Sequence, residues 1–510
     1  MTKIEKVDLF QIHDANAVMN IISTQPESLQ LEYKKSDADL SHDIWETVSA
    51  FANTSGGLII LGVDNTLNGN IIVGVHNPQK QVHDFQNTIC NPSKVSRRCI
   101  IDDDIAMHDF GGKTVIVIRI RELNVYEKPL YLNDNKTKSY IRFGEGDRLA
   151  TDEEYRAMIR NSSFIQDSKA LVGCGVNQLD SNSLEKFKRE VLSNKPTLGE
   201  IDMPSDKFLL SIGLAEENEE LGSIDVKLGT LLLLGKVSTI QHYLPHYHVD
   251  YFSHIGSDTR WSDRVSDDDF GIVELNLFNF FNIVYEKLIT SIRSPFKLNS
   301  EQIRVSNDDF KIILRESLVN TIVHADYHQE FPSIKIDAYE HWVCFINPGK
   351  MLVTPEQFLA GGESRPRNTI IMKGFRLLGL AERQGFGGLT IVRNTIKNVW
   401  RYPDILTDLT HTELKVWNID LADSFTDLTD DEKKAIKLIN KADVGKSLQN
   451  LKRELDISEY KTKKIIDKLL EQSIICKIGN GPSTAYVINN TDMQLAKMED
   501  TIHKIRANAH

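Results

Sequence analysis

Cysteine is scarce in this sequence: the 510 residues include five cysteines, and no two of them form a CxxC pair. Sparse, isolated cysteines exclude a disulfide-stapled secreted domain and are typical of reduced core thiols in a cytoplasmic protein. The five are Cys90, Cys99, Cys174, Cys344 and Cys476. Zinc binding by Cys90, Cys99 and the upstream His83 stays open as an alternative, although this spacing fits no common zinc site.

Long apolar runs and an excess of positive charge are also missing. No run approaches the roughly 18 residues of a membrane-spanning helix, and the opening MTKIEKVDLF lacks the apolar stretch of a signal peptide. The formal net charge of -12 argues against a surface that coats nucleic acid throughout. We therefore expect a cytoplasmic protein without a membrane partner, whose contacts with nucleic acid come from local basic patches.

The length predicts a multidomain chain, because single hydrophobic cores stop growing well below 510 residues. Mixed helix and strand patterns predict the α+β class. In the second domain the pattern predicts a buried segment at 228–236 and a long amphipathic helix at 270–292, without identifiable chemistry. Motif order places the five predicted segments at 1–165, 166–304, 305–424, 425–490 and 491–510.

Residues 27–36, ESLQLEYKKS, predict a β-strand, because apolar and polar residues alternate from Leu29 to Lys34. Glu32 and Lys34 therefore project to one side. Glu27 falls on the opposite pleat face unless the chain bends between the two glutamates. Any half-buried edge strand shows such alternation, so a solvated polar face is the alternative to a functional site.

The segments that follow predict the rest of an α+β domain. Apolar residues at helical spacing predict a helix at 41–54, which the turn-forming residues 53–57 end. The apolar run at 58–65 predicts a central strand that delivers Asp64 to its end, and 71–75 predicts the hairpin partner of this strand.

This first domain resembles the Schlafen-type AlbA-like domain in the order and wording of its segments. The matching segments are ESLQLEYKKS, SAFANTSGGLIILGVDN, IVGV and YIRFGEGDRLAT. In animal Schlafen proteins this domain is a metal-dependent ribonuclease that acts on tRNA and similar RNA. The resemblance puts its three catalytic carboxylates on Glu27, Glu32 and Asp64, which would hold Mg²⁺ or Mn²⁺. Lys34 would neutralise charge developing on phosphorus. Bacterial relatives are usually described as predicted transcriptional regulators, in which the carboxylates need not cut anything.

Two stripes run along a helix predicted near the start of the third domain. Apolar residues recur every four positions from Leu314 to Ile322, while Glu316, Asn320 and His324 form a polar stripe on the nearly opposite face. Such a helix packs on one side and lines a site, or faces water, on the other.

This helix resembles the N-box of GHKL (gyrase, chaperone and histidine-kinase-like) ATP-binding domains, which are α/β sandwiches. The resemblance makes Glu316 the general base for hydrolytic water and Asn320 a ligand of the Mg²⁺ on the phosphates. CFINPGKM stands where this family has its adenine box, with Asn347 in place of the aspartate and Gly349 retained. An amide can bond the adenine edge but supplies no carboxylate, so ATP binding is expected more firmly than hydrolysis.

A glycine-rich turn follows in the expected order. Gly385, Gly387 and Gly388 directly precede a predicted helix, where backbone N–H groups can approach phosphate. Arg365 and Arg367, in GGESRPRNTI, suit a mobile lid over phosphates, an RNA-contacting loop or an ordinary surface turn.

The fourth domain resembles a winged helix-turn-helix, because three helix-length segments precede a strand, a glycine-rich turn and a second strand. Its third helix would present Tyr460, Lys461, Lys463 and Lys464 to the phosphates of duplex DNA. Contact with another protein is the alternative. After it, a short heptad seam at 495–505 predicts pairing into a homo-oligomer with help from other surfaces.

Two functions are compatible with these segments. The first is a nucleotide-regulated, metal-dependent endoribonuclease with a tRNA-like substrate, acting in defence or stress. The second is an ATP-responsive DNA-binding transcriptional regulator without nuclease activity.

Overall fold

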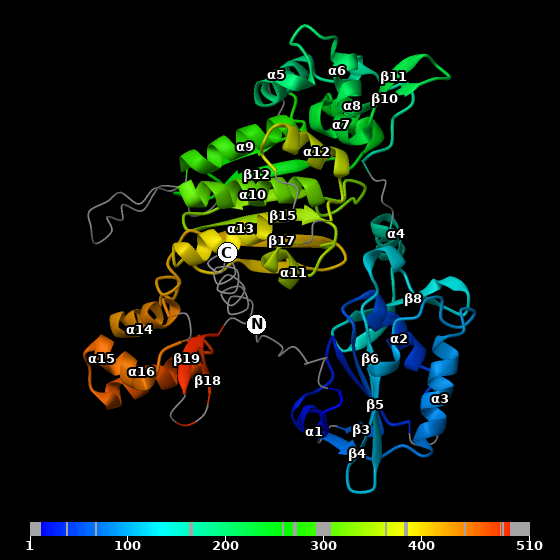
Figure 1. The fold of residues 1–510 in the computed structure, drawn as a ribbon, viewed down its shortest axis with the longest axis vertical. Coiled ribbons are helices and arrows are strands. Elements are labelled where there is room, and N and C mark those ends of the chain that lie inside the picture. The colour runs from blue at the N-terminus through cyan, green and yellow to red at the C-terminus, as the bar shows by residue number, and fades with distance from the viewer. Residues whose placement is uncertain are drawn as a thin grey trace, which may run out of the picture. The chain divides into compact units, whose positions relative to one another are not determined.

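The chain divides into two compact units, unit 1 (Met1–Phe164) and unit 2 (Ile165–His510), and both combine helices with sheets (Figure 1). The α+β class is therefore confirmed. The computed structural model describes residues 12–36, 39–66, 69–162, 167–257, 260–268, 273–291, 308–362, 365–381, 386–442, 445–479, 481 and 484–489. The predicted heptad seam at 495–505 lies outside these ranges.

Unit 1 contains four described α-helices and nine strands. The helices are α1 (Ala15–Thr24), α2 (Ile44–Asn53), α3 (Pro78–Ile89) and α4 (Asp152–Ser162), with 3₁₀ turns at Asp102–Asp104 and Val125–Glu127. The strands are β1 (Leu31–Lys34), β2 (Gly57–Leu61), β3 (Val63–Thr66), β4 (Gly69–Ile72), β5 (Ile105–Asp109), β6 (Thr114–Ile120), β7 (Tyr131–Leu132), β8 (Asn135–Phe143) and β9 (Gly146–Leu149).

A four-stranded sheet of order β1-β2-β6-β5 forms the centre of unit 1, with β1 at one edge. Strand β2 is buried throughout, because successive side chains enter different cores on the two faces of the sheet. Ile59 and Leu61 join the core that contains α2 and α3, whereas Leu58 and Ile60 join the core that contains α1. The nearly continuous apolar run of this strand thus has a direct structural cause.

The strand predicted at 58–65 is wrong in one respect, because the chain breaks at Gly62 into β2 and β3. Gly62 has a φ of +89°, and a Cβ there would lie 2.9 Å from Val75 Cγ2. Both conditions favour glycine. Asp64 therefore belongs to β3, which pairs with β4 in a separate hairpin rather than extending the central strand.

A buried carboxylate in unit 1 gives a testable pH dependence. Burial raises the pKa of Asp104, but hydrogen bonds from Arg121, the backbone N–H of Ile101 and Arg119 outweigh it and hold the pKa below its usual value. A depressed pKa in the folded state contributes stability above the unfolded pKa, which is lost as pH falls through the folded value. Asp104→Asn should lower the free energy of unfolding at neutral pH and reduce the further loss of stability as the pH falls below about 4. Acid unfolding followed by circular dichroism measures both effects. The control, Asp102→Asn at an exposed carboxylate, should leave that loss unchanged.

Unit 2 contains a larger set of elements. The helices are α5 (Ser181–Asn194), α6 (Ser205–Ser211), α7 (Leu228–Leu234), α8 (Val237–Tyr243), α9 (Leu277–Ser291), α10 (Asp308–His324), α11 (Pro355–Ala360), α12 (Thr369–Leu377), α13 (Gly387–Lys397), α14 (Asp430–Asn440), α15 (Leu448–Leu455) and α16 (Glu459–Glu471), with 3₁₀ turns at Val176–Gln178 and Pro196–Leu198. The strands are β10 (Ala215–Asn218), β11 (Ser223–Val226), β12 (Val249–Ser253), β13 (Asp263–Ser266), β14 (Ile334–Ala338), β15 (Trp342–Pro348), β16 (Asp404–Thr407), β17 (His411–Trp417), β18 (Ile475–Ile478) and β19 (Ala485–Ile488).

A six-stranded sheet of order β13-β12-β14-β15-β17-β16 forms the largest layer of unit 2. Helices α9, α10 and α13 run over this sheet in Figure 1. Phe281 of α9, Leu318 of α10 and Ile391 of α13 share one core with Tyr251 and Phe345 of the sheet. This helix layer on a sheet is the expected α/β sandwich, and α10 displays the Glu316 side of its predicted polar stripe away from that core.

Two further predictions in unit 2 can be compared directly. The segment predicted to be buried at 228–236 contains α7, every residue of which is buried. The helix predicted at 270–292 is observed as α9, which begins later, at Leu277. Near the C-terminus, α14, α15, α16 and the β18–β19 hairpin follow in the expected order around a core that also includes Leu359 of α11 and Val392 of α13.

None of the described helices is both long enough and apolar enough to cross a membrane. None of the five cysteines, all of them described, forms a disulfide, and Cys99, Cys174 and Cys344 are buried as expected for core thiols. Cys90 is exposed and Cys476 half-buried, so the core assignment is wrong for these two.

Candidate functional site

A tight turn brings Glu27 back alongside β1. Ser28 and Leu31 form an antiparallel bridge, with the N–H of Ser28 donating to the carbonyl of Leu31 at 3.0 Å. The Oε1 of Glu27 then accepts the backbone N–H of Tyr33 at 3.0 Å. The predicted strand is therefore confirmed only from Leu31 onward. The bend required to bring Glu27 near Glu32 is present.

Glu32 lies in a buried network of ions, and its side of the strand is not a solvated face. Its side chain is 9% exposed, with Oε2 2.7 Å from Arg142 Nη2 and Oε1 2.8 Å from Lys34 Nζ. Arg142 also binds Asp147 at 2.8 Å, and Lys34 binds Asp43 at 2.7 Å. Two cations therefore already bind the two oxygens of Glu32.

The pKa of Glu32 reflects its burial and the charges around it, including that of Glu27. Burial raises the pKa of Glu32 more than Lys34 and Arg142 lower it, and the charge of Glu27 raises it further. The two glutamates predicted to act together are thus electrostatically coupled.

Asp64 does not join this pair. Asp64 lies on β3, where its Oδ2 forms an ion pair with Lys35 Nζ at 3.5 Å. Among the described residues, one group of three or more His, Cys, Asp and Glu brings its ligand atoms within 4.8 Å of one another, and it includes neither Glu27, Glu32 nor Asp64. This group also excludes His83, Cys90 and Cys99, for which zinc binding was the predicted alternative. Because both oxygens of Glu32 are taken by cations, this donor set does not fit Mg²⁺ or Mn²⁺ in the observed arrangement.

The polar stripe of α10 meets the start of α13. A Cβ added at Gly387 would lie 3.1 Å from Asn320 Nδ2 and 3.2 Å from Glu316 Oε2, so both side chains reach the first residue of α13. The buried Asn320 Nδ2 has no hydrogen-bond partner among the described residues. An orphaned buried amide is unusual and calls for a partner. Oxygen ligands beside a helix N-terminus fit a magnesium nucleotide.

One turn further along α10, a second cluster forms at the end of β15. Gly349 has a φ of +92°, and a Cβ there would clash with the guanidinium of Arg367 and lie 3.0 Å from Asp326 Cβ. Burial and the charge of Arg367 lower the pKa of His324 to about 4, so this imidazole is neutral. Asn347, 6% exposed, donates to the carbonyl of Pro348 at 3.2 Å rather than facing solvent. The shape of this corner depends on glycine at position 349.

Two predictions about neighbouring loops need correction. Arg367 is 5% exposed and donates to the carbonyl of Lys350 at 2.7 Å, so it is a packed residue and not part of a mobile lid. A Cβ at Gly388 would clash with the backbone oxygen of Phe358, so this glycine allows α11 and α13 to pack. Gly385 lies outside the described residues.

Three segments of the chain match known family models. Residues 27–151 match the family model described as "Schlafen, AlbA_2", and residues 332–416 match "Putative ATP-dependent DNA helicase recG C-terminal". Residues 27–151 are a Schlafen AlbA_2 domain. Residues 156–250 match a domain of unknown function, DUF8451. The domain content is thus that of an ATP-binding protein related to nucleic acid.

Solved structures give weaker likenesses. The crystal structure of the DIP2311 protein from Corynebacterium diphtheriae is 13% identical, with 90% of this chain and 95% of that chain covered and a TM-score of 0.40. The solution structure of the N-terminal domain of a RecG-related protein from Nitrosomonas europaea is 25% identical, with 26% and 90% covered and a TM-score of 0.21. No curated protein matches the chain significantly.

Outside the AlbA_2 domain, α16 presents the predicted basic residues. Tyr460 is 80% exposed, and Lys461, Lys463 and Lys464 are exposed around it. Lys461 lies 2.6 Å from Asp431, and Lys463 lies 3.6 Å from a glutamate of its own helix. The surface is accessible, but acids partly neutralise two of its three lysines.

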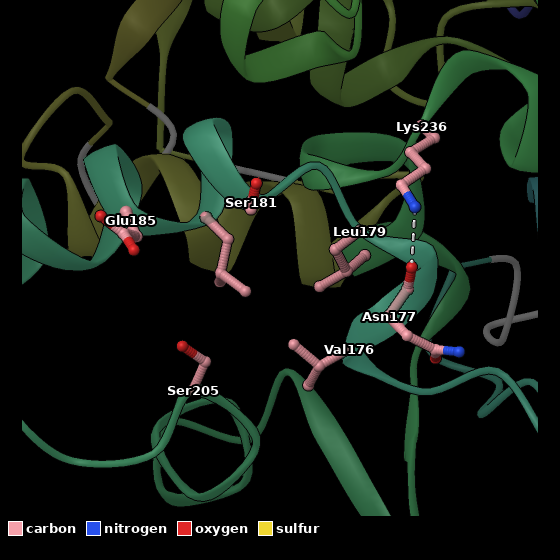
Figure 2. Close-up of a pocket in the computed structure, with 8 residues that line it drawn as sticks. Val176, Asn177, Leu179, Ser181, Glu185, Ser205 and Lys236 are labelled. Atoms are coloured by element: carbon pink, nitrogen blue, oxygen red, sulfur yellow. Dashed lines mark hydrogen bonds between the residues drawn. The ribbon is translucent and has the colours of Figure 1, made fainter.

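A small cleft of about 270 Å³ lies elsewhere in unit 2, within the DUF8451 match (Figure 2). Val176 and Leu179 line it beside Ser181 and Ser205, and Lys236 donates to the carbonyl of Asn177 at 3.0 Å. None of the candidate site residues predicted from the sequence lines this cleft. Its lining mixes apolar and polar side chains and indicates no particular chemistry.

Proposed function

We propose that the chain is a nucleotide-responsive nucleic-acid-binding protein, in which ATP binds between α10, β15 and α13. The observation that carries the proposal is the orphaned Asn320 amide, which lies with Glu316 against the first residue of α13. Asn320 would bind the Mg²⁺ on the phosphates through Oδ1, and its unpartnered Nδ2 would donate to a phosphate oxygen. Glu316 would act as the base for hydrolytic water, and backbone N–H groups at Gly387 would approach the phosphates. Asn347 would bond the adenine edge.

The proposed nucleic-acid contact is duplex DNA on α16. Tyr460 and Lys464 share one exposed side of this helix, since they are four positions apart. Lys464 has no ion pair among the described residues, unlike Lys461 and Lys463. An unneutralised lysine of this kind is suited to a phosphate contact.

The test is fluorescence anisotropy with labelled duplex DNA and labelled tRNA, using the full chain with and without Mg-ATP. ATP should change the affinity, and Asn320→Ala should remove this change while leaving nucleotide-free binding intact. Lys464→Ala should weaken duplex binding and reduce its salt slope by about 1. Absence of binding to both nucleic acids would refute the proposal.

A metal-dependent endoribonuclease is the second candidate, favoured by the turn that places Glu27 beside Glu32. It requires Glu32 to exchange Lys34 or Arg142 for a metal ion. Should this occur, tRNA would be cut in Mg²⁺ or Mn²⁺, and Glu32→Gln would abolish cleavage.

The matched control is Glu154→Gln, which removes another glutamate paired with an arginine of unit 1 and should leave cleavage unchanged. If neither tRNA nor DNA is cut in either metal, with or without ATP, the nuclease candidate is eliminated. Equal loss in both variants would assign the effect to folding.

A further inference from the structure

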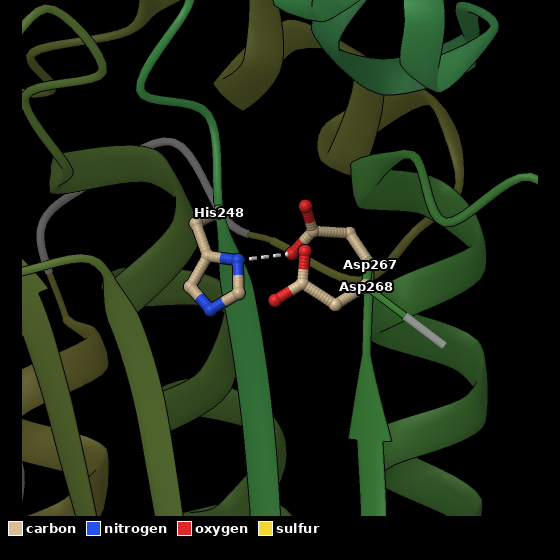
Figure 3. A group of neighbouring side chains, drawn as sticks. All are labelled: His248, Asp267 and Asp268. Atoms are coloured by element: carbon tan, nitrogen blue, oxygen red, sulfur yellow. Dashed lines mark ion pairs between the residues drawn. The ribbon is translucent and has the colours of Figure 1, made fainter. Parts of the chain in front are cut away.

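A histidine and two aspartates meet at one end of the β12–β13 hairpin (Figure 3). His248 directly precedes β12, and Asp267 and Asp268 directly follow β13. The antiparallel register pairs Asp250 with Ser266, which places these flanking residues at the same end of the hairpin. One ligand atom from each of the three lies within 4.8 Å of the others.

The imidazole of His248 is oriented by Asp250, which lies on the side of the ring opposite Asp267. Its Nε2 lies 2.8 Å from Asp250 Oδ2, while Nδ1 lies 2.7 Å from Asp267 Oδ1. Metal-binding histidines characteristically bond a carboxylate through the ring nitrogen that does not bind the metal. Asp250 supplies this feature, so a metal ion would replace the proton that Nδ1 now shares with Asp267 Oδ1.

Asp267 is also held in place before any ion binds. Its side chain is 1% exposed, its Oδ1 accepts the N–H of Val249 at 2.8 Å, and its Oδ2 accepts Gln241 Nε2 at 3.3 Å. Asp268, in contrast, is exposed and leaves the group open to solvent on one side. A fixed ligand beside an open side is what an exchangeable ion needs, because water can occupy the remaining positions.

The charge of the group favours a cation. Three carboxylates surround one imidazole, and Asp250 is partly balanced by Arg264 at 3.6 Å. The oxygen in this ion pair, Oδ1 of Asp250, is buried and makes no hydrogen bond among the described residues.

We propose that His248 Nδ1, Asp267 and Asp268 bind a divalent transition-metal ion, with Asp250 orienting the imidazole. One nitrogen and two carboxylate ligands suit Zn²⁺ or Mn²⁺ better than Ca²⁺, which takes oxygen ligands alone. The site lies on a different part of the sheet from the proposed nucleotide residues, and it is independent of the AlbA_2 carboxylates. A bound ion would tie the start of β12 to the end of β13.

The experiment is calorimetric titration of the chelator-stripped full chain with Zn²⁺ in the absence of nucleotide, repeated with Mn²⁺. The unsubstituted chain should bind one ion, and Asp268→Asn, at an exposed residue, should weaken binding at least about tenfold. Asp250→Asn should weaken it about 10- to 100-fold through the orientation of His248.

The matched control is His254→Gln, because His254 also pairs with an aspartate of this sheet, Asp337, at 3.1 Å but lacks the two further carboxylates. This variant should bind Zn²⁺ as the unsubstituted chain does. The proposal is overturned if neither metal binds, or if Asp268→Asn and His254→Gln alter binding equally.

Discussion

Arg142→Met is expected to destabilise the AlbA_2 domain by about 3–5 kcal/mol, the usual effect of breaking a buried ion pair from one side. The guanidinium is buried and binds Glu32 and Asp147, and it also donates to the carbonyls of Ser28 and Leu31. Methionine fills most of the volume but removes the cation bound to Asp147 and leaves Glu32 with Lys34 alone. Hydrogen exchange followed by mass spectrometry, read on the peptides of unit 1 in the full chain, measures the change.

The matched control for this prediction is Arg148→Met on the neighbouring strand β9. Arg148 binds Glu154 through two nitrogens, at 2.6 and 2.8 Å, but its side chain is 39% exposed. An ion pair open to water contributes at most about 1 kcal/mol. Similar losses in the two variants would contradict the importance assigned to the buried network around Glu32.

The ion-pair network around Glu32 also explains why the role of this residue was hard to predict from residues 27–36, ESLQLEYKKS. Alternation within the strand correctly placed Glu32 and Lys34 on one side, since side-chain direction is a local property of the backbone. The partner that buries Glu32 is Arg142, 110 positions later, and no spacing within the strand indicates it. The turn at Ser28 is likewise decided by the backbone bonds to Leu31 rather than by the alternation.

Prediction from sequence was more successful where the signal was local. Helix α10 and its two stripes were predicted because helical periodicity needs only neighbouring residues, and Leu314 and Leu318 are buried as expected. The glycines show the limit of such reasoning. Gly388 was predicted to serve phosphate, yet its need for glycine comes from the backbone of Phe358 on another helix, a contact that only the tertiary structure contains.

Asn320→Ala is expected to weaken Mg-ATP binding by about 100-fold, or ~2.7 kcal/mol. Loss of an outer-shell partner alone typically lowers metal affinity about 10- to 100-fold, and Asn320 is proposed as a direct ligand. Alanine also removes the amide that has no partner in the described structure, so the fold should lose little stability. Isothermal titration calorimetry with Mg-ATP gives the affinity, and thermal unfolding without nucleotide checks the fold.

Two further variants separate the proposed site from general damage to the helix layer. Asn394→Ala removes an amide on α13 that donates only to the carbonyl of Thr390 one turn away, and it should leave Mg-ATP affinity unchanged. Gly387→Ala should weaken binding, because its Cβ would lie 3.1 Å from Asn320 Nδ2 in the space that the phosphates need. If Asn320→Ala binds Mg-ATP as tightly as the unsubstituted chain, α10 does not hold the nucleotide, and the proposed ATP control of nucleic-acid binding falls with it.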